Sequence, residues 1–284
     1  MSEPTAPQAR VDLHTHSDRS DGTLPPAELV ALAKDREVQL LSLTDHDSIE
    51  GCDAAAAACK AQRIQFLAGT ELSSLWRGRE IHIVGLRLST DSPSLAAHLS
   101  RVRAMRVARL RAIGERLTRH GLAGTQLVDT VLNLPGTPTR LHLARLLVEQ
   151  GEAKDTDDAF KHWLGRGQRA AVAAEWPAPA ACVEAIKAAG GVAVLAHPHR
   201  YQLSAGGLRE LCAQFREAGG AGIEVSLAGM GPGDTSRAAT LARRFGLAGS
   251  LGSDFHQPGI PWRPLGRWLK LPDGVTPITA LLGL

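Results

Sequence analysis

Two histidines separated by one residue, His14 and His16, are the first side chains in the chain that could do chemistry together. Residues at positions i and i+2 of an extended segment project from the same face, and Val11 and Leu13 predict a short buried strand that ends here. Neutral imidazoles aimed at one point are ligands for a transition metal. An isolated pair of this kind is a weak signal, so its weight depends on the rest of the chain.

Further candidate ligands lie in or directly after other short apolar runs. They are Asp21, His46, Glu71, His82, His197, Asp254 and His256. Taken singly, each has an ordinary structural explanation, such as a helix cap or a buried hydrogen bond. Their recurrence where predicted strands end favours one shared metal cluster, because the carboxyl ends of the strands form the catalytic face of a β/α barrel.

The composition of this ligand set indicates which metals it would bind. Imidazoles mixed with carboxylates, without thiolates, suit Mn²⁺, Zn²⁺ or Fe²⁺, and we expect manganese first. A single catalytic zinc takes about three protein ligands, so this many ligands predict two or three divalent metals. Metals about 3.5–4 Å apart are typical of phosphoryl chemistry, in which a metal-bound hydroxide attacks phosphorus and no side chain has to be the nucleophile.

The strands that must position these ligands alternate with predicted helices. Strands are expected at 11–13, 39–44, 64–68, 80–86, 192–196, 222–226 and 247–252, and helices at 25–36, 48–61, 178–189, 206–218 and 234–245. Repeated β-then-α units predict an α/β fold with a mostly parallel sheet, and seven units predict a TIM-like barrel. The pattern stops between about 90 and 175, where helices are expected at 93–120, 138–150 and 155–164. We therefore expect a barrel formed by 10–92 and 176–284, with a helical cap inserted at 93–175.

The inserted segment carries many arginines. A basic helix usually presents its charges to solvent, and most arginines of 101–119 fall on such a face when the segment is placed on a helix. Arg106 and Arg109 fall within the apolar stripe, where a guanidinium is costly unless it meets an anion. A substrate phosphate would supply that anion. Arg140 and His142, at the start of the next predicted helix, are expected to contact the substrate too.

In its ligand motifs the chain resembles the PHP (polymerase and histidinol phosphatase) family. The motifs are His14-Thr15-His16, Asp21, Thr44-Asp45-His46-Asp47, Glu71, His82, Leu195-Ala196-His197-Pro198 and Ser253-Asp254-Phe255-His256. The resemblance implies a distorted (β/α)₇ barrel, in agreement with the strand count. The length, the helical insertion and the segment 137–142 are most similar to a bacterial branch of 3′,5′-nucleoside bisphosphate phosphatases and 5′-to-3′ exoribonucleases.

The resemblance also implies how the ligands are shared. His14, His16, Glu71 and Asp254 would hold one metal, Asp21, His46 and His256 a second, and Glu71, His82 and His197 a third, with Glu71 bridging. Asp12 and Asp45 are expected behind the ligands, where each would accept the other N–H of a ligating imidazole. Arg106 and Arg109 would grip a phosphate of the substrate.

The expected activity is hydrolysis of the 3′-phosphate of a nucleoside 3′,5′-bisphosphate, because the arginines would hold a second phosphate at a fixed distance from the metals. A short RNA with a 5′-phosphate presents the same local pattern and is a further expected substrate. Two alternatives stay open: another PHP activity, such as histidinol phosphate hydrolysis, and a non-catalytic PHP module that binds metal. The complete ligand set argues against the second.

Bulk properties favour a cytoplasmic protein. The net charge is only +3, so composition alone gives no evidence for nucleic acid as a partner. The segment 1–10 is polar, without the apolar core of a secretory signal, and no stretch is apolar and long enough to span a membrane. The four cysteines show no C-x-x-C spacing and are expected to be free thiols. No obligatory protein partner is evident.

Overall fold

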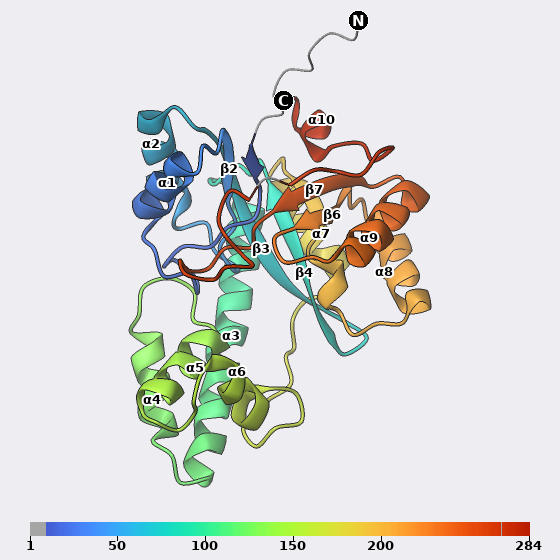
Figure 1. Cartoon of the computed structure of the whole chain (residues 1–284). Coiled ribbons are helices and arrows are strands. Elements are labelled where there is room, and N and C mark those ends of the chain that lie inside the picture. The colour runs from blue at the N-terminus through green and yellow to red at the C-terminus, as the bar shows by residue number, and fades with distance from the viewer. Residues whose placement is uncertain (1–9, 268) are drawn as a thin grey trace, which may run out of the picture.

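Seven strands in sequence order form a nearly closed barrel in the computed structural model, which describes residues 10–267 and 269–284 (Figure 1). The strands are β1 (Val11–Asp12), β2 (Leu40–Leu43), β3 (Gln65–Trp76), β4 (Arg79–Leu86), β5 (Val192–Leu195), β6 (Gly222–Leu227) and β7 (Ala248–Gly252). The amide of Leu13 donates to the carbonyl of Leu251 at 3.2 Å, which links β1 to β7. The expected TIM-like α/β barrel is therefore confirmed. The polar segment 1–9 lies outside the described residues.

The sheet is parallel except around β4. This strand pairs antiparallel with both β3 and β5, whereas the other four pairs are parallel. Arg77 and Gly78 join β3 to β4 with φ values of 49° and 71°, as a type I′ hairpin requires. The expected mostly parallel sheet is confirmed, but the β-then-α pattern is interrupted here, because a two-residue turn leaves no room for a crossover helix. The reversal explains why His82 lies near the start of its strand and still reaches the same edge as ligands that follow other strands.

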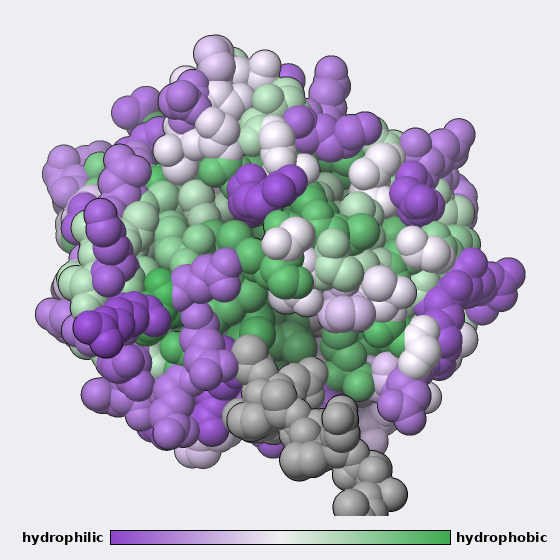
Figure 2. All heavy atoms as spheres, turned by 90° about the horizontal axis from the view of Figure 1, so that it is seen from above, coloured by the Kyte–Doolittle hydropathy of each residue, from purple (hydrophilic) through white to green (hydrophobic). Residues whose placement is uncertain are grey.

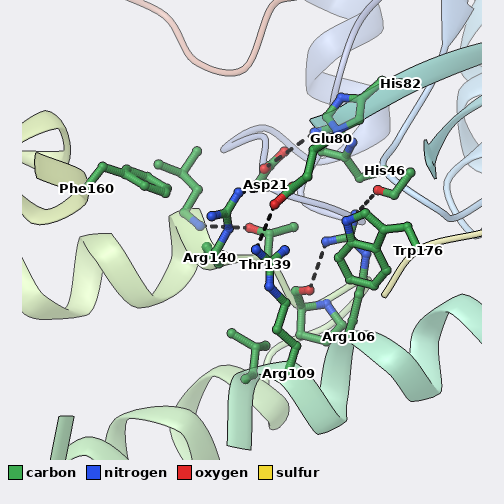
Figure 3. A pocket seen from close by; sticks show the side chains of 14 residues that line it. Asp21, His46, Glu80, His82, Arg106, Arg109, Thr139, Arg140, Phe160 and Trp176 are labelled. Carbon is green, nitrogen blue, oxygen red and sulfur yellow. Dashed lines mark hydrogen bonds and ion pairs between the residues drawn. The ribbon is translucent and has the colours of Figure 1, made fainter. Parts of the chain in front are cut away.

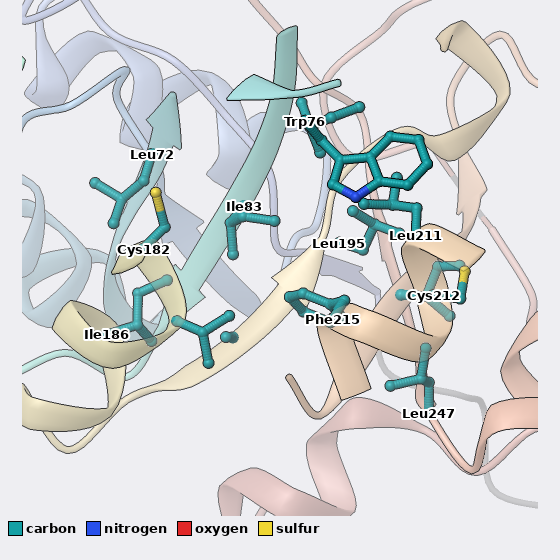
Figure 4. Packing of buried hydrophobic residues seen from close by; sticks show 14 of the residues in the cluster. Leu72, Trp76, Ile83, Cys182, Ile186, Leu195, Leu211, Cys212, Phe215 and Leu247 are labelled. Carbon is teal, nitrogen blue, oxygen red and sulfur yellow. The ribbon is translucent and has the colours of Figure 1, made fainter. Parts of the chain in front are cut away.

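Helices pack around the barrel and bury its outer apolar face. They are α1 (Pro26–Asp35), α2 (Cys52–Gln62), α7 (Pro179–Ala188), α8 (Ala205–Glu217), α9 (Pro232–Phe245) and the short α10 (Ile278–Leu282). Ile83 of β4 and Leu195 of β5 lie against Ile186 of α7 and Phe215 of α8, all nearly inaccessible to water (Figure 4). All four cysteines are free and buried, as expected. This packed layer fixes the strand ends that carry the ligands.

The inserted helices lie together beside the barrel, below it in Figure 1. They are α3 (Pro93–Arg119), α4 (Gly124–Leu132), α5 (Arg140–Glu149), the single turn α6 (Thr156–Ala159) and a π-helical turn, Phe160–Leu164. The group has its own apolar core, which includes Leu110, Val128 and Leu147. Helix α4 was not predicted, although Leu127, Val128 and Val131 have helical spacing.

The barrel end that faces away from the inserted helices is apolar in its middle and polar at its rim, as the view from above shows (Figure 2). In the described part of the chain, no helix combines the length and the apolar character that crossing a membrane requires.

Candidate metal centre

The nine predicted metal ligands converge at one end of the barrel. The loop after β1 supplies His14, His16 and Asp21, the loop after β2 supplies His46, β3 and β4 supply Glu71 and His82, and the loops after β5 and β7 supply His197, Asp254 and His256. Their ligand atoms form three overlapping groups, within each of which all lie within 4.8 Å of one another: His14, His16, Glu71 and Asp254; His16, Asp21, His46 and His256; and His46, Glu71 and His82.

His197 joins the third group through Glu71. Its Nε2 lies 2.8 Å from Oε1 of Glu71, and Nδ1 of His82 lies 2.8 Å from the same oxygen. The grouping differs from the one implied by the resemblance, in which His197 belongs to the third group itself, in two further ways. His16 also lies in the group of Asp21, and His46 also lies in the group of His82.

Several potential ligand atoms at the centre have no hydrogen-bond partner within the described residues. They are Oδ1 of Asp21, Nδ1 of His46, Oε2 of Glu71 and Nδ1 of His197. In addition, Nε2 of His14 and Nε2 of His16 lie 3.1 Å apart, each 3.2 Å from Oε2 of Glu71. Imidazole nitrogens and carboxylate oxygens that converge in a protein interior with few hydrogen bonds are costly, and divalent cations would satisfy them together. The donor set therefore fits a cluster of metals that accept nitrogen and oxygen ligands.

Burial and mutual charge set the protonation of the ligands. Burial opposes the charged form of His16, but the carboxylates of Asp254 and Glu71 outweigh it and raise the pKa to about 10. Burial likewise opposes ionisation of Glu71, yet the surrounding histidines hold the pKa of this carboxyl well below its usual value. At His46 burial prevails over the nearby carboxylates and lowers the pKa to about 3. The carboxylates are thus ionised near neutral pH, as metal ligands must be.

Three residues of the ligand loops adopt a left-handed backbone conformation. The φ angle is 45° at Asp47, 25° at His197 and 51° at Asp254. Such angles are rare for residues other than glycine and persist only where surrounding contacts enforce them, commonly at functional sites. The amide of Asp254 donates to the carbonyl of His14 at 2.8 Å, and that of Asp47 donates to the carbonyl of Glu71 at 2.9 Å. These contacts hold the sharp turns that aim the ligands inward.

The expected role of Asp12 is wrong. Its carboxylate accepts hydrogen bonds from the backbone amides of Ser253 at 2.8 Å and Gly266 at 2.9 Å, and none from an imidazole. Asp12 lies within β1 and not in the loop that carries the ligands. At this level of the barrel the carboxylate meets backbone amides that need an acceptor. Glu224 of β6 orients the histidine instead, with Oε1 2.7 Å from Nδ1 of His14. Its position as the one charged residue of the predicted strand 222–226 could have indicated this role.

Asp45 acts on the ligands only indirectly, which corrects the expectation of a direct contact. Its carboxylate accepts hydrogen bonds from the amide and the hydroxyl of Ser17, both at 2.7 Å, and from the hydroxyl of Ser20 at 2.6 Å. The hydroxyl oxygen of Ser20 in turn lies 3.4 Å from Nδ1 of His16. Ser20 therefore stands between Asp45 and the imidazole, because the loop after β1 folds back over this carboxylate.

A pocket of about 110 Å³ opens between the metal ligands and the inserted helices (Figure 3). Asp21, His46 and His82 line it on the barrel side, and Arg106, Arg109 and Arg140 line it on the other side. The structure therefore brings three of the four predicted substrate residues next to the predicted metal ligands.

The three arginines already have anionic partners within the protein. Nε of Arg106 donates to Oδ2 of Asp47 at 2.7 Å. Arg109 and Arg140 both contact the carboxylate of Glu80, at 2.7 and 3.2 Å. Although burial opposes it, these two arginines lower the pKa of Glu80 to about 2. Arg106 and Arg109 thus meet an anion, as expected, but carboxylates of the protein supply it. Their place in the apolar stripe therefore does not by itself indicate a substrate phosphate, and substrate binding by these arginines remains a prediction that their position in the pocket favours.

The predicted anion site at the start of α5 is closed by a cap. Nδ1 of His142 accepts a hydrogen bond from the amide of Thr139 at 3.1 Å, and the hydroxyl of Thr139 accepts one from the amide of Leu141 at 3.2 Å. This capping box uses up the groups that would bind an anion. His142 does not line the pocket, so the expected contact with substrate is replaced by a structural role.

Sequence reasoning missed two further side chains near the centre. Trp176, expected only at a domain boundary, lies with its ring centroid 5.2 Å from the guanidinium carbon of Arg106 and 5.3 Å from that of Arg109. Its indole N–H has no hydrogen-bond partner in the described part of the chain. Arg200 donates a hydrogen bond to the carboxylate of Asp254. Its position three residues after the predicted ligand His197 could have indicated that Arg200 lies near the centre.

Known proteins resemble this chain over nearly its whole length. The family model described as PHP domain matches residues 12–134. A 5′-3′ exoribonuclease of Haemophilus influenzae is 41% identical over 269 residues, which cover 95% of this chain and 97% of that protein. A 3′,5′-nucleoside bisphosphate phosphatase of Chromobacterium violaceum is 40% identical over 273 residues, 95% of each chain.

The fold is also similar to solved structures. The structure of an amidohydrolase from Chromobacterium violaceum, with bound sulfate and no metal, superposes with a TM-score of 0.90 at 39% sequence identity. The similarity covers 97% of this chain and 96% of that one.

Proposed function

The chain belongs to the PHP family, and from this premise we propose that it is a metal-dependent phosphoesterase that removes the 3′-phosphate of nucleoside 3′,5′-bisphosphates. One observation carries the proposal: the pocket in which three arginines face the predicted metal ligands. A substrate with two phosphates can place one on each side of this pocket. The name of the relative from Chromobacterium violaceum supports the same substrate class.

On the barrel side, two or three divalent cations, with manganese favoured, would polarise the scissile phosphate and activate water when bound. The protein groups around them are held in place by direct contacts. Glu71 lies between His82 and His197 and fixes both rings. Arg200 donates to Asp254, and Glu224 fixes the orientation of His14. These contacts organise the site before substrate arrives, which is the main protein contribution in such catalysis.

On the other side, 93–175 would act as a substrate-binding cap on the barrel of 10–92 and 176–284. The second phosphate would replace Glu80 as the partner of Arg109 and Arg140, since a guanidinium fork binds phosphate and carboxylate alike. The free indole N–H of Trp176 offers one more donor within the described part of the chain. The distance from this pocket to the metal ligands then selects substrates with two phosphates. A cytoplasmic location is part of the proposal, supported by four free, buried thiols.

The test compares adenosine 3′,5′-bisphosphate with adenosine 3′-monophosphate in the presence of Mn²⁺. Both carry the scissile phosphate, and only the first carries the 5′-phosphate. We expect kcat/KM to be about 10–100-fold higher for the bisphosphate, the magnitude of one or two charged hydrogen bonds. The variant Arg109→Ala should lose most of this preference, whereas Arg237→Ala, a surface arginine of α9, should keep it. Equal kcat/KM for the two substrates in the wild type would contradict the proposal.

A short RNA with a 5′-phosphate is the second proposed substrate, because its first internucleotide linkage takes the place of the 3′-phosphate. The name of the Haemophilus influenzae relative supports it. Histidinol phosphate has a single phosphate and would leave the arginines unused. A non-catalytic metal-binding module would show no turnover of any of these compounds.

A further inference from the structure

A second, larger depression continues from the pocket and has a volume of about 960 Å³. The two share Glu80, His82, Arg109, Arg140 and Phe160. From this shared wall the depression extends along the β3–β4 turn at 78–79, the segment 164–174 and the residues 200–202 that follow β5. Its volume lies at the upper end of the range of about 300–1,000 Å³ for pockets that hold whole small ligands. It therefore has room for more than the single nucleotide that the smaller pocket serves.

The lining of this larger depression, from here on called the groove, is strongly cationic. It contains six arginines, at 79, 109, 116, 140, 166 and 200, against one carboxylate, Glu80. Four of the arginines are engaged: Arg109 and Arg140 with Glu80, Arg200 with Asp254, and Arg116 with a backbone carbonyl.

The other two, Arg79 and Arg166, line the groove but not the smaller pocket. Neither side chain has an ion-pair or hydrogen-bond partner within residues 10–267 and 269–284. Arg79 is the first residue of β4, next to the hairpin turn, and Arg166 lies in the loop after the π-helical turn. Two unpaired cations of the described chain thus line the groove from two separate segments. Such an arrangement complements a chain with several negative charges better than it complements one small anion.

The groove also offers an aromatic surface. Phe160 lies in the wall that both cavities share, with the guanidinium carbon of Arg140 5.6 Å from its ring centroid. Bases of single-stranded nucleic acid stack on rings of this kind irrespective of sequence. At the metal end the groove passes His82, where a chain leaving the metal centre would enter it.

We propose that this groove binds the RNA strand on the 3′ side of the scissile linkage, with Arg79 and Arg166 contacting its backbone phosphates. The inference rests on the proposed function, because it takes the scissile phosphate to lie at the metal centre. It adds a binding site for the nucleotides that follow, and it predicts that affinity for RNA grows with length until the groove is filled.

The experiment measures KM for 5′-phosphorylated RNAs of two, four and eight nucleotides, with adenosine 3′,5′-bisphosphate as the reference substrate. In the wild type we expect KM to fall as the RNA lengthens. In the double variant Arg79→Gln/Arg166→Gln this dependence should disappear, with KM for the longest RNA about tenfold higher and the reference substrate changed by less than about twofold. The matched control is Arg237→Gln, which removes an exposed arginine from α9.

A binding measurement decides the point independently of turnover. Fluorescence anisotropy of the labelled eight-nucleotide RNA, measured over a salt series, should give a shallower dependence of log K on log salt in the double variant, by about 0.7 for each phosphate that is no longer neutralised. Unchanged affinity and slope, or an equal loss of affinity for RNA and for the bisphosphate, would overturn the groove assignment. If the wild type hydrolyses neither substrate, the proposed function fails, and the anisotropy still reports on the groove.

Discussion

Nε of Arg106, on the inserted helix α3, donates a hydrogen bond to Oδ2 of Asp47 at 2.7 Å, and Asp47 directly follows the predicted metal ligand His46. Both side chains are buried. The second carboxylate oxygen of Asp47 accepts a hydrogen bond from the amide of Ser73 on β3 at 2.7 Å. One carboxylate therefore joins the inserted helices, a ligand loop and a central strand of the barrel.

Removing the arginine from this pair should destabilise the protein. Arg106→Ala leaves the Asp47 carboxylate buried without its counter-charge, so the free energy of unfolding should fall by about 3–5 kcal/mol. The double variant Arg106→Ala/Asp47→Asn should recover part of this stability, because no unpaired charge remains. Urea unfolding of the wild type, both single variants and the double variant measures the coupling. Additive effects of the two substitutions would show that the two side chains do not interact energetically.

Glu224 should control metal affinity without being a ligand. Its carboxylate accepts the Nδ1–H of His14, which directs Nε2 toward the metals and makes it a better donor. Glu224→Gln should weaken the binding of the first metal about 10–100-fold while leaving the fold intact. Titration of the metal-free protein with Mn²⁺ measures this effect, and Glu217→Gln at the exposed end of α8 is the control. Wild-type affinity in the Glu224→Gln variant would exclude the orienting role.

Metal loading should release protons near neutral pH. In the metal-free protein the neighbouring carboxylates, against the effect of burial, raise the pKa of His16 to about 10 and that of His14 well above its usual value, so protonation of this pair is favoured near pH 7. A metal binds only the neutral ring, so binding must displace these protons, and affinity should rise with pH. Calorimetric titration in buffers of different ionisation enthalpy counts the protons. A heat of binding independent of the buffer would disprove the prediction.

Glu80 should make stability depend on pH in the acid range. Its pKa in the folded protein, about 2, lies below the usual value of 4.5, because Arg140 and Arg109 favour the charged form against the effect of burial. For a lowered pKa the contribution is fully present above about pH 4.5 and disappears as the pH falls toward 2. Glu80→Gln should therefore be less stable than the wild type at pH 6, and the difference should shrink toward pH 3. Chemical denaturation at several pH values tests this, and a difference that grows toward low pH would have the wrong sign.

The convergence of the predicted ligands was predictable because it depends on local chemistry. Histidines and carboxylates directly after apolar runs must gather at one edge when the strands are parallel, whatever the details of packing. The orientation of β4 was harder to predict, because the apolar pattern of a strand is the same in either direction. The short turn at Arg77 and Gly78 forces this strand to reverse. His82 lies beside the other predicted ligands. Because β4 runs in the opposite direction, this histidine reaches them from the first half of its strand and not from the loop after it.

The groups behind the ligands could not be assigned from the sequence. Asp12 and Glu224 are both lone carboxylates in apolar strands, and their roles differ because one faces backbone amides and the other faces His14. Likewise, helical periodicity placed Arg106 and Arg109 in one stripe of their helix, but it could not show that Asp47 and Glu80 lie opposite them.

The sequence by itself determined the α/β barrel, the seven strands and the candidate metal ligands, because strand periodicity and ligand chemistry act over a few neighbouring residues. Only the tertiary structure decided which carboxylates pair with the arginines, which acidic group orients His14, and that a cationic groove extends from the site. These features depend on contacts between distant segments, such as that of His14 with Glu224, which are 210 positions apart. Contacts of that kind are set by packing geometry, which no local pattern encodes.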